Sequence, residues 1–321
     1  MFSYRHAFHA GNHADVLKHT TLIAVLRHMV QKDTALHVFD THAGAGLYRL
    51  DGDYAQTSGE AVDGYLRLAL QKNEAPTRMV QGQAAIKIES KKPAEAVPLA
   101  PALLDYLNLI ASFNPGGGHK VYPGSPFIIN HLLQGRERDR LKLFELHPTD
   151  AKTLSANVAQ LNAGRLITVL QEDGFEGLRK FLPPPSRRAL VLCDPSYEMK
   201  TDYARVTAMM TDAVNRFATG TYMVWYPIIP RPEAHDLPRK LKTLANRESR
   251  PWLNATLTVK SSKLGTDDEG EVVRPGLPAS GVFVINPPHT LKATLTAALS
   301  QATKLLAQGK HKAFEVESGG H

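Results

Sequence analysis

The residues best suited to chemistry are Asp194, Pro195, Ser196 and Tyr197, which directly follow the apolar segment 189–193. A carboxylate and a backbone carbonyl can accept hydrogen bonds from the two hydrogens of an exocyclic amine such as N6 of adenine, and so direct its lone pair toward a methyl donor. An aromatic ring can stack on a base that has left its helix. The four residues indicate methylation of a nucleobase amine, although a strand that merely ends in a proline turn would contain them too.

A second motif lies upstream, where the apolar strand 36–40 ends at Asp40 and leads into a turn with Gly44 and Gly46. Glycine lets the backbone approach a nucleoside closely because it has no Cβ. The dinucleotide fingerprint needs a third glycine or alanine three residues after Gly46, where Arg49 stands instead. The turn therefore disfavours a pyrophosphate and fits S-adenosylmethionine, which has none.

Composition limits the class of protein. The 321 residues are 43% hydrophobic and 21% charged, as in ordinary soluble globular proteins. We find no apolar run of membrane-spanning length and no signal-peptide core at the N-terminus, so we expect no membrane partner. The one cysteine, Cys193, excludes internal disulfides and fits a reducing cytoplasm, where we expect the protein to act.

The chain is basic, with a formal net charge of +7 and a pI near 9.3. This balance favours a polyanionic partner, against the alternative of a mildly basic surface without special use. Basic residues gather at 136–140, 187–188 and 239–240, and Arg5, Lys18 and Arg49 flank the expected cofactor end.

Strand-like and helix-like segments alternate, which predicts an α/β fold with a doubly wound sheet of seven strands. The expected strands are 36–40, 141–146, 166–170, 189–193, 221–226, 253–259 and 280–286. The expected helices are 13–32, capped by Asn12, and 149–161, 175–181, 201–217, 233–246 and 290–308. The last two strands should form an antiparallel hairpin around 261–279, and the polar tail after 308 should be loose.

About a hundred residues between the first two strands contain no convincing strand. Thr57 and Glu60 have capping-box spacing before an apolar pattern from Val62 to Leu68, and Pro101 can start a helix that runs to Phe113. Residues 72–100 are polar and are expected to form a flexible loop. We therefore expect one methyltransferase domain, residues 1–321, with a helical insertion at about 51–120.

The chain resembles, over nearly its whole length, the bacterial 23S ribosomal RNA adenine-N6 methyltransferases of the RlmJ type. The most specific segment is 4–19 (YRHAFHAGNHADVLKH), and the similarity continues through 40–46, 122–126, 145–148, 173–175, 194–200, 225–227 and 279–288. The resemblance implies a Rossmann-like methyltransferase fold, S-adenosylmethionine as cofactor and 23S ribosomal RNA as partner. This sequence departs from the family at Ser196, where a second proline is usual, and in the polar stretch 81–98, which is longer.

The resemblance also implies roles for single residues. Asp194 would hold the target amine and take its proton, the Pro195 carbonyl would be the second acceptor, and Tyr197 would stack on the flipped adenine. Tyr4 would contact the RNA substrate.

On the cofactor side, Glu145 would bind the ribose hydroxyls and Asp173 the adenine amine. Under the alternative these are ordinary surface acids, but acids at successive strand ends match the edge where parallel sheets bind ligands. The remaining cofactor contacts would be Lys18, His19, His42, Gly44, Gly46, Ser125, Gly174 and Asp194. Lys18 suits the cofactor's carboxylate.

Methyl transfer from a sulfonium is expected to proceed by in-line displacement, which needs alignment and desolvation but no metal. His6, His9, His13 and His19 would not share one helical face, so we expect no metal site, and we expect a monomer. Two alternatives to ribosomal RNA methylation stay open: a DNA adenine-N6 methyltransferase, and a non-catalytic RNA-binding relic. No separate target-recognition domain is visible, which weakens the first, and retention of Asp194, Pro195 and Tyr197 together weakens the second.

Overall fold

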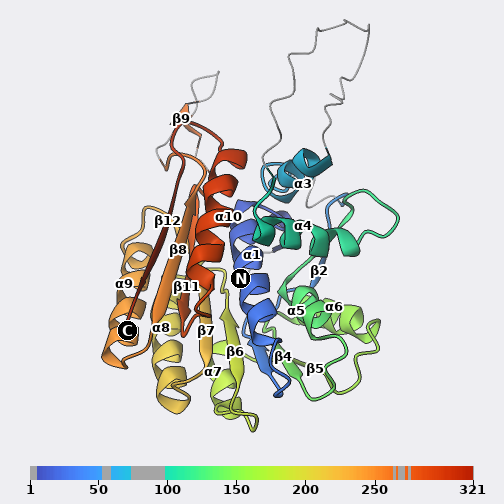
Figure 1. Cartoon of the computed structure of the whole chain (residues 1–321), viewed down its shortest axis with the longest axis vertical. Coiled ribbons are helices and arrows are strands. Elements are labelled where there is room, and N and C mark those ends of the chain that lie inside the picture. The colour runs from blue at the N-terminus through green and yellow to red at the C-terminus, as the bar shows by residue number, and fades with distance from the viewer. Residues whose placement is uncertain are drawn as a thin grey trace, which may run out of the picture.

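The computed structural model describes residues 6–52, 59–73, 98–262, 265–266, 272–273 and 276–320. Its centre is an eight-stranded sheet (Figure 1). The strands, in spatial order, are β12 (Ala313–Gly319), β8 (Trp252–Thr258), β11 (Ala279–Ile285), β7 (Thr221–Ile228), β6 (Ala189–Cys193), β1 (His37–Asp40), β4 (Arg140–Phe144) and β5 (Ile167–Leu170).

The pairing of the strands confirms a doubly wound sheet. β7, β6, β1, β4 and β5 are parallel to one another. β11 runs antiparallel to β7, β8 to β11, and β12 to β8. The chain winds outward from β1 to β5 and then returns to β6, so the topological switch point lies between β1 and β6. All seven expected strands are present, and the hairpin of β8 and β11 forms as predicted.

The tail after residue 308 is the exception, because the prediction that it is loose was wrong. Residues 313–319 form β12, which pairs with the edge of β8 in register Val316 with Ala255. Phe314 and Val316 alternate with Glu315 and Glu317, which is the pattern of a strand with one covered face.

Helices cover both faces of the sheet (Figure 1). One face carries α8 (Lys200–Arg216) and α9 (Pro232–Arg247), and the other carries α1 (His13–Met29), α5 (Ser125–Leu133) and α10 (Leu291–Leu305). The short helix α7 (Gly174–Gly177), the 3-10 turn η2 (Leu178–Phe181) and α6 (Pro148–Ala159) follow β5 and β4. These positions confirm the helices expected from the sequence. Because both faces are covered, the apolar strand β6 is buried at all of its residues.

Proline opens several helices and so fixes where they begin. Pro148 and Pro232 stand in the first turn of α6 and α9, and Pro101 does so in α4 (Pro101–Ser112). Proline lacks the N–H that would be unpaired there, and its fixed φ suits the first turn. The predicted start of α4 at Pro101 is confirmed.

The long segment between β1 and β4 contains α3 (Tyr65–Asn73) and α4, as expected of a helical insertion. In the sequence, β2 (Leu47–Arg49) precedes these helices and β3 (Val121–Pro123) follows them, and the two strands pair as an antiparallel ribbon. This ribbon and α5 were not predicted. Three-residue strands are too short to give a readable alternation. Tyr4, the capping residue Thr57 and most of the 72–100 segment lie outside the described residues. Within the described part of the chain, no helix is both long and apolar enough to cross a membrane.

Candidate active site

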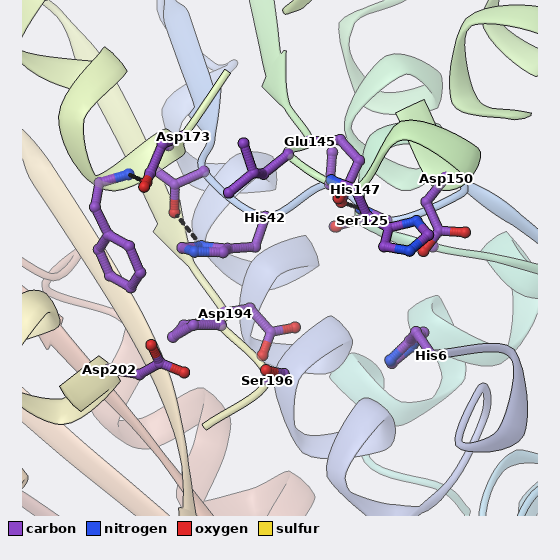
Figure 2. Close-up of a pocket in the computed structure, with 18 of the residues that line it drawn as sticks. His6, His42, Ser125, Glu145, His147, Asp150, Asp173, Asp194, Ser196 and Asp202 are labelled. Carbon is purple, nitrogen blue, oxygen red and sulfur yellow. Dashed lines mark hydrogen bonds between the residues drawn. The ribbon is translucent and has the colours of Figure 1, made fainter. Parts of the chain in front are cut away.

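A cavity of about 360 Å³ opens at the carboxyl ends of β1, β4, β5 and β6, beside the switch point (Figure 2). The turn after β6 supplies Asp194, Pro195 and Ser196 to its lining, and helix α1 supplies Lys18. The turn after β6 and the glycine turn after β1 therefore meet at one site.

Lys18 contacts Asp194 directly, because its ammonium lies against Asp194 Oδ2. The same ammonium is 2.9 Å from Asp15 Oδ1. Burial alone would lower the pKa of Lys18, but the two carboxylates raise it overall. In this structure Lys18 is therefore the counter-ion of Asp194 and Asp15, whereas the sequence indicated a contact with the carboxylate of the cofactor.

The two glycines of the first motif have different positions. Gly44 lines the cavity at φ +61°, and its N–H donates to Glu145 Oε2 at 2.8 Å. Gly46, at φ +82°, does not line the cavity: a Cβ there would lie 2.8 Å from Leu154 Cδ1 and 2.9 Å from Phe127 Cε2. Gly46 shapes the turn from behind, so its expected contact with the cofactor is not seen.

Glu145 follows β4 and lines the cavity with both carboxylate oxygens held by backbone donors. Oε2 accepts from Gly44 N, and Oε1 accepts from His147 N at 2.7 Å. Burial raises the pKa of Glu145, and these two N–H groups oppose that rise. Each oxygen can accept a further hydrogen bond, so the group can receive a pair of adjacent hydroxyls.

Asp173 lies after β5 and its oxygens are already engaged. Oδ1 accepts from Phe175 N at 3.0 Å and caps α7, while Oδ2 is 2.5 Å from Arg205. The Arg205 guanidinium also lies over the Phe175 ring, 4.2 Å from its centroid. Next to Asp173, a Cβ on Gly174 would come within 2.0 Å of the Thr41 carbonyl oxygen, so only glycine fits this close approach of two strand ends.

His19 and His42 are neutral at this site, because burial lowers the pKa of each to about 3. His42 Nδ1 is 2.8 Å from Thr41 Oγ1, the hydrogen bond drawn as a dashed line at His42 in Figure 2. His19 Nδ1 is 2.8 Å from the Tyr122 hydroxyl. Within the described part of the chain, His19 Nε2 is buried without a hydrogen-bond partner. When Tyr122 donates to Nδ1, Nε2 bears the hydrogen and is a ready donor for an anion.

Ser125 begins α5 and lines the cavity, where its hydroxyl donates to Asp40 Oδ2 at 2.7 Å. Asp40 is fully buried at the end of β1, and burial raises its pKa to about 7. The Ser125 hydrogen bond opposes that rise and the nearby Asp194 adds to it.

These residues fit S-adenosylmethionine. The Glu145 carboxylate can receive the two hydroxyls of a ribose. His19 Nε2, which has no hydrogen-bond partner among the described residues and lies 4.0 Å from Asp15 Oδ1, can donate to an amino-acid carboxylate. The rings of Phe175 and His42 stand edge to face, with 4.6 Å between their centroids, and both line the same cavity. Among the described residues, no group of three or more His, Cys, Asp or Glu side chains is arranged to hold a metal ion.

The structure does not bring Tyr197 to the cavity. Its side chain is buried, 2% exposed, and its hydroxyl donates to the Trp225 carbonyl oxygen at 2.7 Å. Its ring lies 4.7 Å from that of Tyr203, and its φ is +54°. The left-handed backbone turns the ring into the core, an orientation that the sequence alone does not reveal.

Sequence reasoning also missed part of the lining, namely Thr41, His147, Phe175, Asp202 and Arg205. His147 and Phe175 stand two residues after Glu145 and Asp173. They would have been predicted if the two residues that follow each strand-end acid had been included as candidates. Asp202 and Arg205 are ordinary polar residues of α8 and give no signal in the sequence.

The basic groups 136–140 and 187–188 do not gather at the cavity. Arg136 donates to the carbonyls of Val30 and Lys32, and Arg188 donates to those of Met29 and Thr34. They hold carbonyls at and just after the end of α1. This region lies at the amino ends of β1 and β6, whereas the cavity lies at the carboxyl ends of these strands. Cations are favourable at a helix C-terminus.

Comparison with known proteins agrees with this geometry. The family model described as Ribosomal RNA large subunit methyltransferase D, RlmJ, matches residues 33–92 and 79–316. Two relatives are named Ribosomal RNA large subunit methyltransferase J. That of Escherichia coli is 38% identical, covering 91% of this chain and 89% of its own, and that of Haemophilus influenzae is 36% identical, covering 99% and 98%.

A crystal structure of a protein from Legionella pneumophila has the same fold, with a TM-score of 0.77 at 28% identity, over 97% of this chain and 98% of that one. The resemblance seen in the sequence is thus confirmed along almost the entire chain. The chain belongs to the RlmJ family of ribosomal RNA large subunit methyltransferases.

Proposed function

We propose that this protein transfers the methyl group of S-adenosylmethionine to N6 of an adenine in 23S ribosomal RNA. Membership of the RlmJ family supports the ribosomal RNA substrate. The single observation that carries the chemistry is that Asp194 and Pro195 line the same cavity as Glu145 and Gly44. An amine acceptor and a nucleoside cradle therefore share one enclosed space.

The cofactor would supply a methyl group already activated by its sulfonium charge. Glu145 would hold the ribose hydroxyls, while His19 Nε2 would face the carboxylate of the cofactor. Asp173 would bind the adenine amine with an oxygen that it shares with Arg205. Gly46, which lies behind the turn, would act only through the shape of that turn.

The target adenine would leave its helix and present N6 to Asp194 and to the Pro195 carbonyl, each of which accepts one N6 hydrogen. Asp194 and the Pro195 carbonyl would hold N6 so that its lone pair could form the new C–N bond as the methyl group leaves the sulfonium, whose sulfur would keep the electron pair of the broken C–S bond. Asp194 then accepts the surplus proton from N6 and releases it to water. Both acceptors act on charge that develops only during the transfer, which is where such groups contribute most.

Stacking of Tyr197 on the adenine is part of the proposal, and it requires the turn 194–199 to rearrange. The ring would have to give up its hydrogen bond to Trp225 and its contact with Tyr203. The net charge of +7 suits a polyanionic RNA partner, and we propose that the enzyme acts as a monomer.

The test is methylation in vitro with isotopically labelled S-adenosylmethionine, followed by mass analysis of the nucleosides. A 23S ribosomal RNA transcript should yield N6-methyladenosine, and duplex DNA of equal length should yield far less. Asp194→Ala should lower the single-turnover rate by roughly a hundredfold or more. Its cofactor affinity should stay unchanged, because Asp15 still pairs with Lys18.

Asp212→Ala is the matched control, since Asp212 is an exposed acid of α8 paired with Arg216. It should leave the rate unchanged. Methylation of DNA in preference to RNA, methylation at another atom, or a fully active Asp194→Ala variant would each contradict the proposal.

A further inference from the structure

Asp15 is a buried acid that the proposed chemistry does not use. It lies in the first turn of α1 and is 1% exposed, and it lies behind Lys18 rather than in the lining of the cavity. Removing a carboxylate from water is strongly unfavourable unless several donors compensate it. Its contacts therefore indicate what it is for.

Both oxygens of Asp15 are occupied. Oδ2 accepts from Gly11 N at 2.8 Å and is 3.1 Å from His6 Nε2, and Oδ1 is 2.9 Å from Lys18 Nζ. On its other side, the Lys18 ammonium lies against Asp194 Oδ2. A continuous chain of polar contacts thus runs from the N-terminal segment through α1 to the catalytic turn.

One ammonium therefore serves two carboxylates. Burial opposes the charged form of Asp15, but Lys18, and after it His6, hold the pKa of this carboxyl well below its ordinary value. Other groups near Lys18 do not compete for the ammonium: burial keeps His19 neutral, and Asp40 is bonded to Ser125. Lys18 is 4% exposed, so water does not replace either carboxylate.

This sharing matters when a target amine arrives. In the free protein Lys18 occupies an oxygen of Asp194, the acceptor that N6 needs. If Asp194 were the sole counter-ion of Lys18, giving up that contact would leave a buried ammonium unpaired, which is strongly unfavourable. With Asp15 at 2.9 Å, Lys18 keeps a partner while Asp194 turns to the amine.

We propose that Asp15 is a positioning residue for methyl transfer, which retains Lys18 as an ion pair while Asp194 exchanges that lysine for the target amine. The proposal rests on the proposed function. Asp15 acts through Lys18 and touches neither the base nor the cofactor. Its removal should therefore affect the rate of transfer and spare cofactor binding.

The first variant is Asp15→Asn, which keeps the shape and an acceptor oxygen but removes the charge. Lys18 then has Asp194 as its one carboxylate partner and should hold it. We expect the single-turnover rate on 23S ribosomal RNA to fall by roughly tenfold or more, as for loss of an electrostatic group. S-adenosylmethionine affinity, measured by calorimetry, should be unchanged, and Asp15→Glu, which restores the charge, should recover part of the rate.

Thr21→Val is the control for packing, because Thr21 is fully buried on the same helix and its hydroxyl bonds only to the Leu17 carbonyl among described groups. It should change neither rate nor affinity. If Asp15→Asn keeps the wild-type rate, or if rate and cofactor affinity fall together by the same factor in both Asp15→Asn and Asp15→Glu, Asp15 is structural and the proposal is wrong.

A double variant tests whether Asp15 affects the methyl-transfer rate through Lys18. Because it replaces both members of the buried ion pair, it leaves neither Asp15 nor Lys18 as an unpaired buried charge. Adding Asp15→Asn to Lys18→Gln should lower the rate by much less than Asp15→Asn does in the wild type, since the lysine it acts on is gone. Equal factors in both backgrounds would overturn the proposal. A wild-type protein that does not methylate ribosomal RNA would instead overturn the proposed function, and this inference with it.

Discussion

Asp40 is the residue whose burial has the clearest consequence for pH. Burial raises its pKa to about 7, so between pH 4 and 7 the native state holds a proton that the unfolded chain has released. The stability that this proton contributes is fully present below about pH 4 and is lost as the pH rises through about 7.

Asp40→Asn cannot ionise and still accepts the Ser125 hydrogen bond, so it should remove this pH dependence. We expect the melting temperature of the variant, relative to wild type, to be higher at pH 8 than at pH 5. Asp33→Asn, at an exposed site on the loop before β1, should show no such difference. A relative melting temperature of Asp40→Asn that is the same at both pH values would show that Asp40 is not the buried group that titrates.

Glu145 is the residue on which the cofactor assignment depends most. Glu145→Gln places an amide N–H₂ group against one of the two backbone N–H donors, Gly44 and His147. It also removes the negative charge that would accept hydrogen bonds from the ribose hydroxyls. Loss of a charged hydrogen bond, about 1.5–3 kcal/mol, should weaken S-adenosylmethionine binding roughly tenfold or more in calorimetry.

Glu172→Gln is the matched control, because Glu172 follows the neighbouring strand β5 but forms an exposed ion pair with Lys180 at 2.6 Å. The affinity of Glu172→Gln for S-adenosylmethionine should equal that of the wild-type protein. Equal affinities for all three proteins would remove Glu145 from the cofactor site.

Single residues also show what the sequence can and cannot reveal. Glu145, Asp173 and Asp194 were predicted to meet because the carboxyl ends of parallel strands share one edge, and they do line one cavity. Tyr197 was placed on the base, but its position depends on a backbone φ of +54° that no motif encodes. The buried partner Asp15 was missed, because a polar residue early in a helix ordinarily faces solvent.

At the scale of elements, β12 is the main difference between expectation and structure. Its pairing with β8 is non-local, and partly covered alternation in a polar tail gives a weak signal. The strand contacts α10, and its Glu317 is 3.0 Å from Lys242 of α9. It therefore covers the edge of the antiparallel part of the sheet.

Removing residues 313–321 should expose that edge and the apolar side chains beneath it. We expect the melting temperature to fall by roughly 5 °C or more. We also expect increased self-association, since an open strand edge can pair with another chain. Lys310→Ala, on the exposed loop before β12, is the control and should melt as wild type does. An unchanged melting temperature after truncation would mean that β12 adds no stability.

At the scale of the whole molecule, we propose that residues 1–321 form one domain. The helices of the insertion pack onto the core of the sheet, with α4 against α1 and α10. α1 itself crosses the centre of the fold (Figure 1). It packs against α4 of the insertion and against β11 of the sheet, and its Lys18 contacts Asp194 at the cavity.

We propose that this molecule methylates N6 of an adenine in 23S ribosomal RNA through Asp194. The most direct measurement is mass mapping of 23S ribosomal RNA from cells that lack the gene, complemented with the wild-type protein or with Asp194→Ala. We predict that one adenosine loses its N6-methyl group in the deletion, regains it with wild type and stays unmodified with Asp194→Ala. An unchanged ribosomal RNA methylation pattern in the deletion, or restoration by Asp194→Ala, would contradict the claim.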